Sequence, residues 1–176
     1  MRLRCAYLAA ILALAVALTP AVQAEGGFAV AAKGAALIEA RTGRVLFAQN
    51  ADEMLPMAST TKIMTCLLAL ENSSLDETVT AGPNAYGTPG TSIYLSEGES
   101  LTMEQMLYGL MLRSGNDAAV AIAEHIAGSV EGFAELMNSR AAELGADAEY
   151  VNPHGLSARG HRASALAQTL IMREGL

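Results

Sequence analysis

A serine and a lysine stand three residues apart at Ser59 and Lys62, a spacing that suits acyl-transfer chemistry. Residues three apart in a helix share one face, so the Lys62 amine can reach the Ser59 hydroxyl. A serine hydroxyl is a poor nucleophile until a base removes its proton, and a lysine can be that base when burial lowers its pKa from about 10.4. The pair predicts a nucleophile with its general base. Placement in the first turn of a helix would also favour negative charge on the reacting oxygens.

The same two residues have a purely structural explanation. Ser59 can cap the helix, and Lys62 can be solvated near the helix start. The chain contains only two lysines, and Lys62 is followed by Ile63 and Met64 rather than by a polar face. These neighbours favour a buried lysine, but taken alone the pair leaves both explanations open.

A second group of polar residues, Ser114-Gly115-Asn116, falls in a short break between two predicted helices. Ser114 can relay a proton between Lys62 and a leaving amine. Asn116 can hold Lys62 with its side-chain oxygen and a substrate amide with its nitrogen. The alternative is that Ser114 or Asn116 only caps the helix that starts at Asp117, and taken alone this capping explanation is the stronger one.

Together the two motifs resemble those of the low-molecular-mass penicillin-binding proteins with D-alanyl-D-alanine carboxypeptidase activity. That superfamily carries Ser-x-x-Lys, a Ser-x-Asn-type partner and Lys-Thr-Gly. The resemblance runs from about Phe28 to Arg173. The stretches that carry it are Ala58–Thr65, Ser114–Ala119, Asn50–Glu53, Asn152–Leu156 and Gly160-His161.

The resemblance implies a serine peptidase that removes the terminal D-alanine from peptidoglycan stem peptides through an acyl-serine intermediate. Ser59 would be the nucleophile, Lys62 the general base and Ser114 the proton relay. Asn116 would bind substrate, and the Ser59 backbone N–H would be one oxyanion donor. Muropeptides would be the substrates and β-lactams the inhibitors. The implied fold is the β-lactamase/transpeptidase-like α/β architecture, an antiparallel sheet flanked by helices with an all-helical subdomain.

The sequence departs from the family pattern at two places. No Lys-Thr-Gly follows the helical block, since the other lysine, Lys33, lies upstream. In the family that motif recognises the substrate carboxylate from a sheet strand, so the chain as given is expected to bind substrate poorly and to be inactive in isolation. A catalytically inactive cell-wall-binding fragment is therefore the alternative. Residues 162–167 also lack the family's aromatic and hydroxyl-rich stretch, so the resemblance does not predict how this segment packs.

A serine β-lactamase is a further alternative, because it would share Ser59 and Lys62. A class A enzyme also needs a glutamate that activates the deacylating water. Glu135 with Asn138 is the nearest candidate, but both residues fall inside a predicted amphipathic helix. Fast and complete turnover of a β-lactam would favour the lactamase.

The three histidines are not expected to be catalytic. His125 is interpreted as a packing or surface residue, His154 as a structural turn residue and His161 as a loop contact. No pair has metal-ligand spacing such as His-Glu-x-x-His, so neither a metal nor a cofactor is expected.

Hydrophobic periodicity and turn residues predict the elements that carry these motifs. A hairpin is expected within Gly34–Asn50, with strands at 35–38 and 45–47, as the edge of a larger antiparallel sheet. The helix that follows Ser59 runs to about Glu71 and is apolar on most sides, which predicts a buried central helix. Capping residues and glycines delimit further helices at 102–113, 117–127 and 129–144. Helical spacing continues to Leu176, which predicts an α/β domain incomplete at the C-terminus.

The first 24 residues have the pattern of a signal peptide, and residues 25–176 are expected to form the N-terminal part of the peptidase domain. Arg2 and Arg4 precede an apolar run from Cys5 to Leu18, which is shorter than the roughly 20 residues of a membrane span. Small residues suit cleavage after Ala24, with an N-terminal anchor helix as the alternative. The expected location is the periplasm or the outer face of the cytoplasmic membrane, with anchoring only through a region after Leu176.

Charge and cysteine content narrow the partners further. Without Arg2 and Arg4 the chain has 9 basic and 18 acidic residues, which argues against a nucleic-acid partner. Cys66 is then the sole cysteine, so no internal disulfide can form and stability must come from a packed core.

Overall fold

The computed structural model of the protein describes residues 29–176. The predicted signal peptide, residues 1–24, lies outside this range and stays a prediction. Within the described range, no helix has both the length and the apolar character needed to cross a bilayer.

The chain begins with the predicted hairpin. Strands β1 (Ala35–Ile38) and β2 (Val45–Gln49) pair antiparallel, with an irregularity in register between Leu37 and Ile38. Gly43 adopts a φ of 75° in the connecting turn, a conformation that glycine reaches without steric cost. The hairpin is confirmed, but among residues 29–176 it pairs only with itself, so its role as the edge of a larger sheet stays a prediction.

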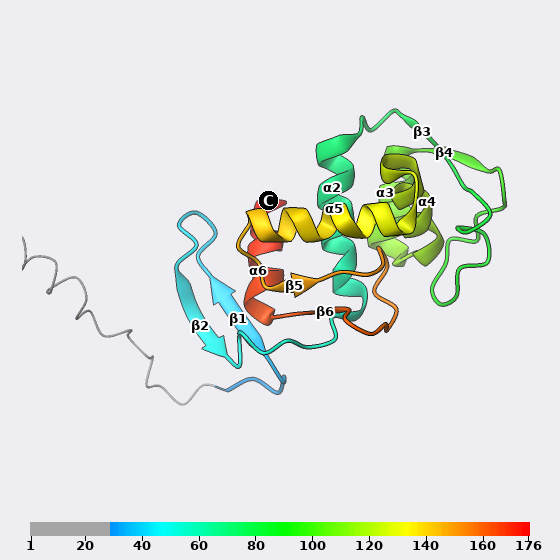
Figure 1. Ribbon diagram of the computed structural model, residues 1–176. Helices are drawn as coiled ribbons and strands as arrows, with labels where there is room; N and C mark the ends of the chain where they lie inside the picture. Colours follow the sequence, from blue (N-terminus) through cyan, green and yellow to red (C-terminus); the bar gives the residue numbers. More distant parts are fainter. Residues whose placement is uncertain (1–28) are drawn as a thin grey trace, which may run out of the picture.

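Helix α6 (Ala165–Glu174) packs against the hairpin, as Figure 1 shows. Arg173, in the last turn of α6, donates a hydrogen bond of 2.6 Å to the backbone carbonyl of Ala40. Because two strands alone are marginally stable in water, this helix supplies the packing that the hairpin needs.

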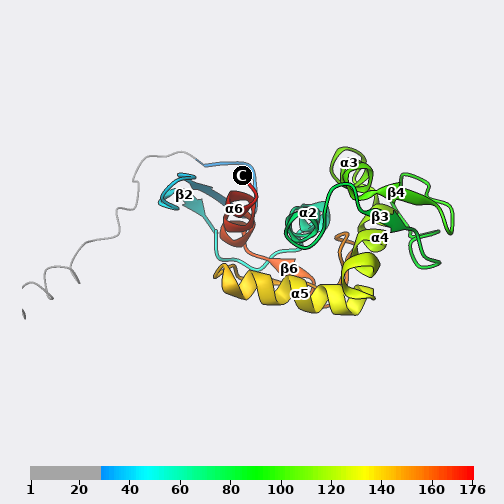
Figure 2. The ribbon, with the colours of Figure 1, turned by 90° about the horizontal axis from the view of Figure 1, so that it is seen from above.

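The central element is helix α2 (Thr61–Asn72), which follows a 3₁₀ turn, η1 (Ala58–Thr60). Ser59 therefore lies in the 3₁₀ turn, just before the α-helix rather than within its first turn. Helix α2 contacts α6 and three further helices: α3 (Met103–Arg113), α4 (Asn116–Ala127) and α5 (Val130–Glu143). Figure 2 shows α2 between the hairpin with α6 on one side and α3 with α4 on the other. The prediction of a buried central helix is confirmed.

Local signals set the ends of the flanking helices as predicted. The Thr102 side chain accepts the backbone N–H of Gln105, whose side chain bonds back to the Thr102 backbone, so the capping box is complete. Ser129 caps α5 by accepting the N–H of Gly132, and Gly128 ends α4 with a φ of 76°.

Four short strands complete the described fold in two antiparallel pairs. Strand β3 (Thr78–Thr80) pairs with β4 (Ser100–Thr102), and β5 (Ala148–Glu149) pairs with β6 (Arg162–Ala163). The last pair was not predicted, because two residues are too few for an alternating pattern to show. Ala163 is buried there and bridges to Leu55, so the segment that departs from the family pattern is packed.

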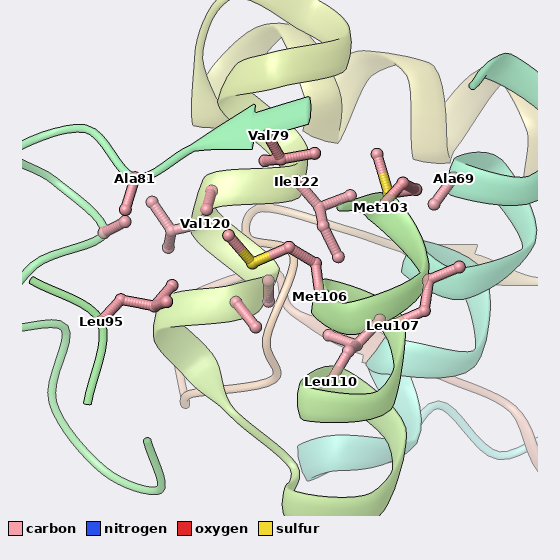
Figure 3. Packing of buried hydrophobic residues seen from close by; sticks show 14 residues of the cluster. Ala69, Val79, Ala81, Leu95, Met103, Met106, Leu107, Leu110, Val120 and Ile122 are labelled. Atoms are coloured by element: carbon pink, nitrogen blue, oxygen red, sulfur yellow. The ribbon is translucent and has the colours of Figure 1, made fainter. Parts of the chain in front are cut away.

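Two hydrophobic clusters lie on opposite sides of α2. Figure 3 shows the first, in which Met103, Met106 and Leu110 of α3 face Val120 and Ile122 of α4. The second cluster joins the other side of α2 to α5 and α6; its largest fully buried members are Phe133, Met64, Leu68, Met137 and Ile171. Packing on both sides holds α2 in place, and α2 carries the lysine of the first motif.

Truncation of Phe133 tests this packing. Phe133→Ala empties a fully buried site and is expected to lower the free energy of unfolding by about 3–5 kcal/mol, measured by urea denaturation. Leu112→Ala is the control, because Leu112 is 75% exposed and should change the value by less than about 0.5 kcal/mol. Equal losses for the two variants would contradict the assignment of Phe133 to the core.

Candidate functional site

Lys62 is buried in the first turn of α2, with only 2% of its surface exposed. Its Nζ lies 3.4 Å from Ser59 Oγ, 2.7 Å from Asn116 Oδ1 and 2.6 Å from the backbone oxygen of His154. The alternative of a solvated lysine is therefore wrong. The structure brings together Ser59, Lys62 and Asn116, three of the four residues predicted for the site, through direct hydrogen bonds.

Burial lowers the pKa of Lys62 from 10.5 to about 8. At pH 7 about a tenth of the amine is therefore uncharged, far more than for a lysine in water. A neutral amine has two N–H donors and one lone pair, and the short contacts to Asn116 and His154 provide two acceptors for those donors. The longer contact is the one to Ser59 Oγ, so in the neutral form the lone pair is left for the Ser59 proton.

Ser59 is exposed, whereas Lys62 beside it is buried. The residue before it, Ala58, adopts a φ of 48°, a left-handed conformation that is uncommon for a residue with a Cβ. Ala58 is the first residue of the 3₁₀ turn that carries the serine. The hydroxyl is accessible to a ligand while its partner amine is kept from solvent.

The fourth predicted residue, Ser114, lies across a cavity from this pair. The cavity has a volume of about 320 Å³, and its lining includes Ser59, Lys62 and Ser114 together with apolar side chains of α2 and α3. Ser114 is the C-terminal cap residue of α3 and adopts a φ of 55°. The break between α3 and α4 thus places Ser114 at the same opening as the nucleophile candidate.

Asn116 is the first residue of α4, and its side chain is buried. Its Oδ1 accepts from Lys62, and its Nδ2 donates to the backbone oxygen of Pro89 at 2.8 Å. The N-cap position of α4 is Gly115, and no side chain caps this helix. The alternative explanation, in which Ser114 or Asn116 only caps α4, is therefore wrong.

A turn at residues 152–156 supplies the backbone oxygen that binds Lys62. Asn152 Oδ1 holds the turn by accepting the N–H of Gly155 at 2.7 Å and that of His154 at 3.3 Å. The turn is tied to α2 a second time, because Thr65 Oγ1 donates to the backbone oxygen of Pro153 at 2.6 Å. Sequence reasoning missed this contribution, since a backbone acceptor leaves no side-chain signal.

The imidazole of His154 does not take part in the contact with Lys62. Its Nδ1 accepts the backbone N–H of Leu156 at 3.1 Å. Burial, followed by the nearby positive charge of Lys62 and by His161, lowers the pKa of His154 to about 4. The ring is therefore neutral at physiological pH, in agreement with the interpretation of His154 as a structural residue.

Asp117 anchors the loop that borders the site, and the sequence analysis did not identify it. The carboxylate is 1% exposed and accepts hydrogen bonds from Ser92 Oγ at 2.6 Å, from the N–H groups of Ile93 and Leu95 at 3.0 Å, and from the Ala118 N–H at 2.9 Å. The same loop provides Pro89, so Asp117 helps to orient the amide of Asn116.

Opposing effects act on the carboxyl group of Asp117. Burial alone would raise its pKa, but the hydrogen bonds from Ser92 and from the backbone amides outweigh burial and hold the pKa below its usual value. The charged form is thus the stable one in the folded protein.

The remaining candidates occupy other places. His125 Nε2 lies 3.1 Å from Glu77 Oε1 at the end of α4, which agrees with a surface role. Asn138 uses its side chain to bind the backbone of Tyr150 and Ala134 within and beside α5. Glu135 lies in α5, as predicted. Among residues 29–176 no group of three or more His, Cys, Asp or Glu side chains could hold a metal ion.

Comparison with known proteins identifies the family of the chain. A family described as D-alanyl-D-alanine carboxypeptidase matches residues 19–176. The chain belongs to this family.

Curated relatives include the D-alanyl-D-alanine carboxypeptidase DacF of Bacillus subtilis, which is 42% identical over 149 residues. That match covers 81% of this chain and 38% of DacF. DacA of Escherichia coli is 39% identical over 147 residues, which cover 77% of this chain and 36% of DacA. The chain thus spans less than two fifths of the length of these relatives.

Solved structures of the family have the same fold. The D-alanyl-D-alanine carboxypeptidase DacD of Francisella tularensis superposes with a TM-score of 0.80 at 31% identity, over 84% of this chain and 37% of that one. Penicillin-binding protein 6B of Escherichia coli gives 0.79 at 31% identity, over 84% and 50% of the two chains. The predicted transpeptidase-like α/β fold is confirmed.

Replacement of Asp117 tests the loop anchor. Asp117→Asn places an amide NH₂ among backbone donors and is expected to lower the free energy of unfolding at pH 7 by about 2–4 kcal/mol. The pKa of the Asp117 carboxyl is lower in the folded protein than in the unfolded chain. The stability that the carboxylate contributes is therefore present above its usual pKa of 3.8 and is lost as the pH falls through the folded pKa. Urea denaturation between pH 7 and pH 3 should show that the difference in free energy of unfolding between the parent and Asp117→Asn becomes smaller as the pH falls.

The matched control for this experiment is Asp76→Asn, because Asp76 is an exposed carboxylate. It should change the free energy of unfolding by less than about 0.5 kcal/mol at either pH. If Asp117→Asn has the same free energy of unfolding as the unmodified protein at pH 7, Asp117 does not anchor the loop.

Proposed function

We propose that the protein is a serine-type D-Ala-D-Ala carboxypeptidase, which removes the terminal D-alanine of peptidoglycan stem peptides through an acyl-serine intermediate. The observation that carries the proposal is the buried amine of Lys62, with a pKa of about 8, beside the exposed hydroxyl of Ser59. Membership of the D-alanyl-D-alanine carboxypeptidase family supports the choice of substrate.

In the acylation step, the lone pair of Lys62 accepts the Ser59 proton while Oγ attacks the carbonyl carbon between the two D-alanines. The resulting oxyanion is stabilised by the Ser59 backbone N–H, which lies at the start of the η1–α2 helical segment. Asn116 keeps Lys62 in place through Oδ1. Its NH₂ group has two N–H donors, of which one binds Pro89 and the other serves the substrate amide.

Breakdown of the intermediate requires a proton on the leaving amine. The protonated Lys62 supplies it through the hydroxyl of Ser114, which lines the same cavity. The C–N bond then breaks, D-alanine leaves, and the shortened peptide remains as an ester on Ser59. Water, activated by the neutral Lys62, hydrolyses that ester and restores the hydroxyl.

The same chemistry makes β-lactams inhibitors, because attack by Ser59 opens the lactam ring and leaves an acyl-serine. Peptidoglycan lies outside the cytoplasm, so the proposal requires export, for which residues 1–24 would be the signal peptide. Because the chain is acidic, we do not expect it to bind nucleic acid.

Labelling with a fluorescent penicillin tests the nucleophile. The complete gene product should be labelled in a stoichiometric and covalent way, and Ser59→Ala should abolish labelling because no other group accepts the acyl chain. Release of D-alanine from an acetylated peptide ending in D-Ala-D-Ala should disappear in the same variant. The exposed Ser157→Ala variant is the control and should keep both activities. Equal labelling of Ser59→Ala and the unmodified protein would exclude Ser59.

The pH dependence of acylation tests the base. Lys62 acts only when uncharged, so the second-order rate constant should rise about tenfold per pH unit below pH 8 and level off above it. Lys62→Met keeps the length of the side chain but removes the base, and should lower the rate at least about a hundredfold. Lys33→Met, at the exposed second lysine, should leave the profile unchanged. A flat profile between pH 6 and pH 9 would rule out Lys62 as the base.

A further inference from the structure

We propose that His161 and Thr61 are positioning residues for Ser59, which they orient through a hydrogen-bond chain that ends on the backbone carbonyl of Ala58. The inference rests on the proposed function, in which Ser59 is the nucleophile. Neither side chain lines the cavity, and both are buried, His161 with 5% and Thr61 with 0% of its surface exposed.

The direction of the chain follows from its first contact. The backbone N–H of Val151 donates to His161 Nδ1 at 3.2 Å, so in the neutral ring the proton must be on Nε2. Nε2 then donates to Thr61 Oγ1 at 2.8 Å, and the Thr61 hydroxyl donates to the Ala58 oxygen at 2.8 Å. Burial lowers the pKa of His161, which keeps the ring in the neutral form that this arrangement requires.

The end of the chain is a strained residue. Ala58 has a φ of 48°, which is costly for a residue with a Cβ and persists only when its surroundings hold it. Gly155 packs against the same carbonyl so closely that a Cβ there would lie 1.9 Å from the Ala58 oxygen. The backbone N–H of Thr61 also donates to the Ala58 oxygen, so the Thr61 hydroxyl adds a second bond to it, and Gly155 limits the remaining space around this carbonyl group.

That orientation matters because the peptide bond is planar. The Ala58 oxygen and the Ser59 N–H belong to the same trans peptide unit and point in opposite directions. Any rotation of the Ala58 carbonyl therefore turns the Ser59 N–H, the proposed oxyanion donor, by the same angle. By holding the carbonyl, His161 and Thr61 fix the direction of a donor that they do not touch.

The experiment compares paired variants of the complete gene product by the rate of acylation with fluorescent penicillin. Thr61→Val keeps the size of the side chain but removes the hydroxyl, and is expected to slow acylation between about tenfold and a hundredfold, since a misplaced group has effects of that order. Thr61→Ser restores the hydroxyl and should remain within about threefold of the parental rate. His161→Leu should be acylated slowly. His161→Gln should recover most of the rate, because the glutamine amide can accept from the Val151 N–H and donate to Thr61.

Two further measurements separate positioning from a general loss of structure. Melting temperatures are recorded for every variant, and rates are compared well below the lowest of them. The pH at half-maximal rate should stay near 8 in Thr61→Val while the plateau falls, because the chain acts on the oxyanion donor and not on Lys62. Thr169→Val removes a hydroxyl that donates to a backbone carbonyl within α6, and should acylate at the parental rate.

Acylation of Thr61→Val at the parental rate, or an equal loss in Thr61→Ser, would overturn the inference while leaving the proposed function intact. A complete absence of penicillin labelling in the unmodified protein would instead refute the proposed function, and the inference with it.

Discussion

Taking a lysine amine out of water is costly unless its polar hydrogens find acceptors, and the site is built around that requirement. Lys62 lies on a helix packed on both sides, and its amine binds two oxygens, Asn116 Oδ1 and the His154 carbonyl. These come from a helix start and from a turn 92 residues away along the chain. Because the two oxygens are neutral acceptors rather than carboxylates, they satisfy the amine without restoring its normal pKa. A carboxylate in either place would favour the charged form and remove the base.

The surrounding structure divides into parts that hold the base and parts that present the nucleophile. The two hydrophobic clusters fix α2, the buried Asp117 holds the loop that binds Asn116, and Asn152 shapes the turn that carries the His154 carbonyl. Ser59 lies outside this buried frame, in a 3₁₀ turn at the surface of the cavity. This separation of a buried base from an exposed nucleophile suits acyl transfer. The base must be shielded from water, whereas the hydroxyl must be accessible to a ligand that arrives from solvent.

Features that depend on neighbouring residues could be predicted well. The hairpin, the capping box at Thr102, the cap at Ser129 and the glycine that ends α4 follow from side chains acting within one turn of the backbone. The strand pair β5–β6 could not be predicted, because strands of two residues are too short to show an alternating pattern and because Ala163 of this pair also bridges to the distant Leu55. The left-handed Ala58 left no signal either, since its conformation is held by Gly155 and Thr61 rather than by its own side chain.

The sequence by itself placed Ser59 and Lys62 within reach of each other, because side chains three residues apart lie on the same side of a helical segment, here the 3₁₀ turn that leads into α2. It also supplied Ser114 and Asn116 as candidates for the site. Only the tertiary structure decided that Lys62 is buried, that Asn116 binds it instead of capping α4, and that a backbone carbonyl near residue 154 completes its contacts. The reason is physical: local geometry follows from the order of residues, whereas the pKa of an amine depends on the solvent and dipoles around it, and these come from distant parts of the chain.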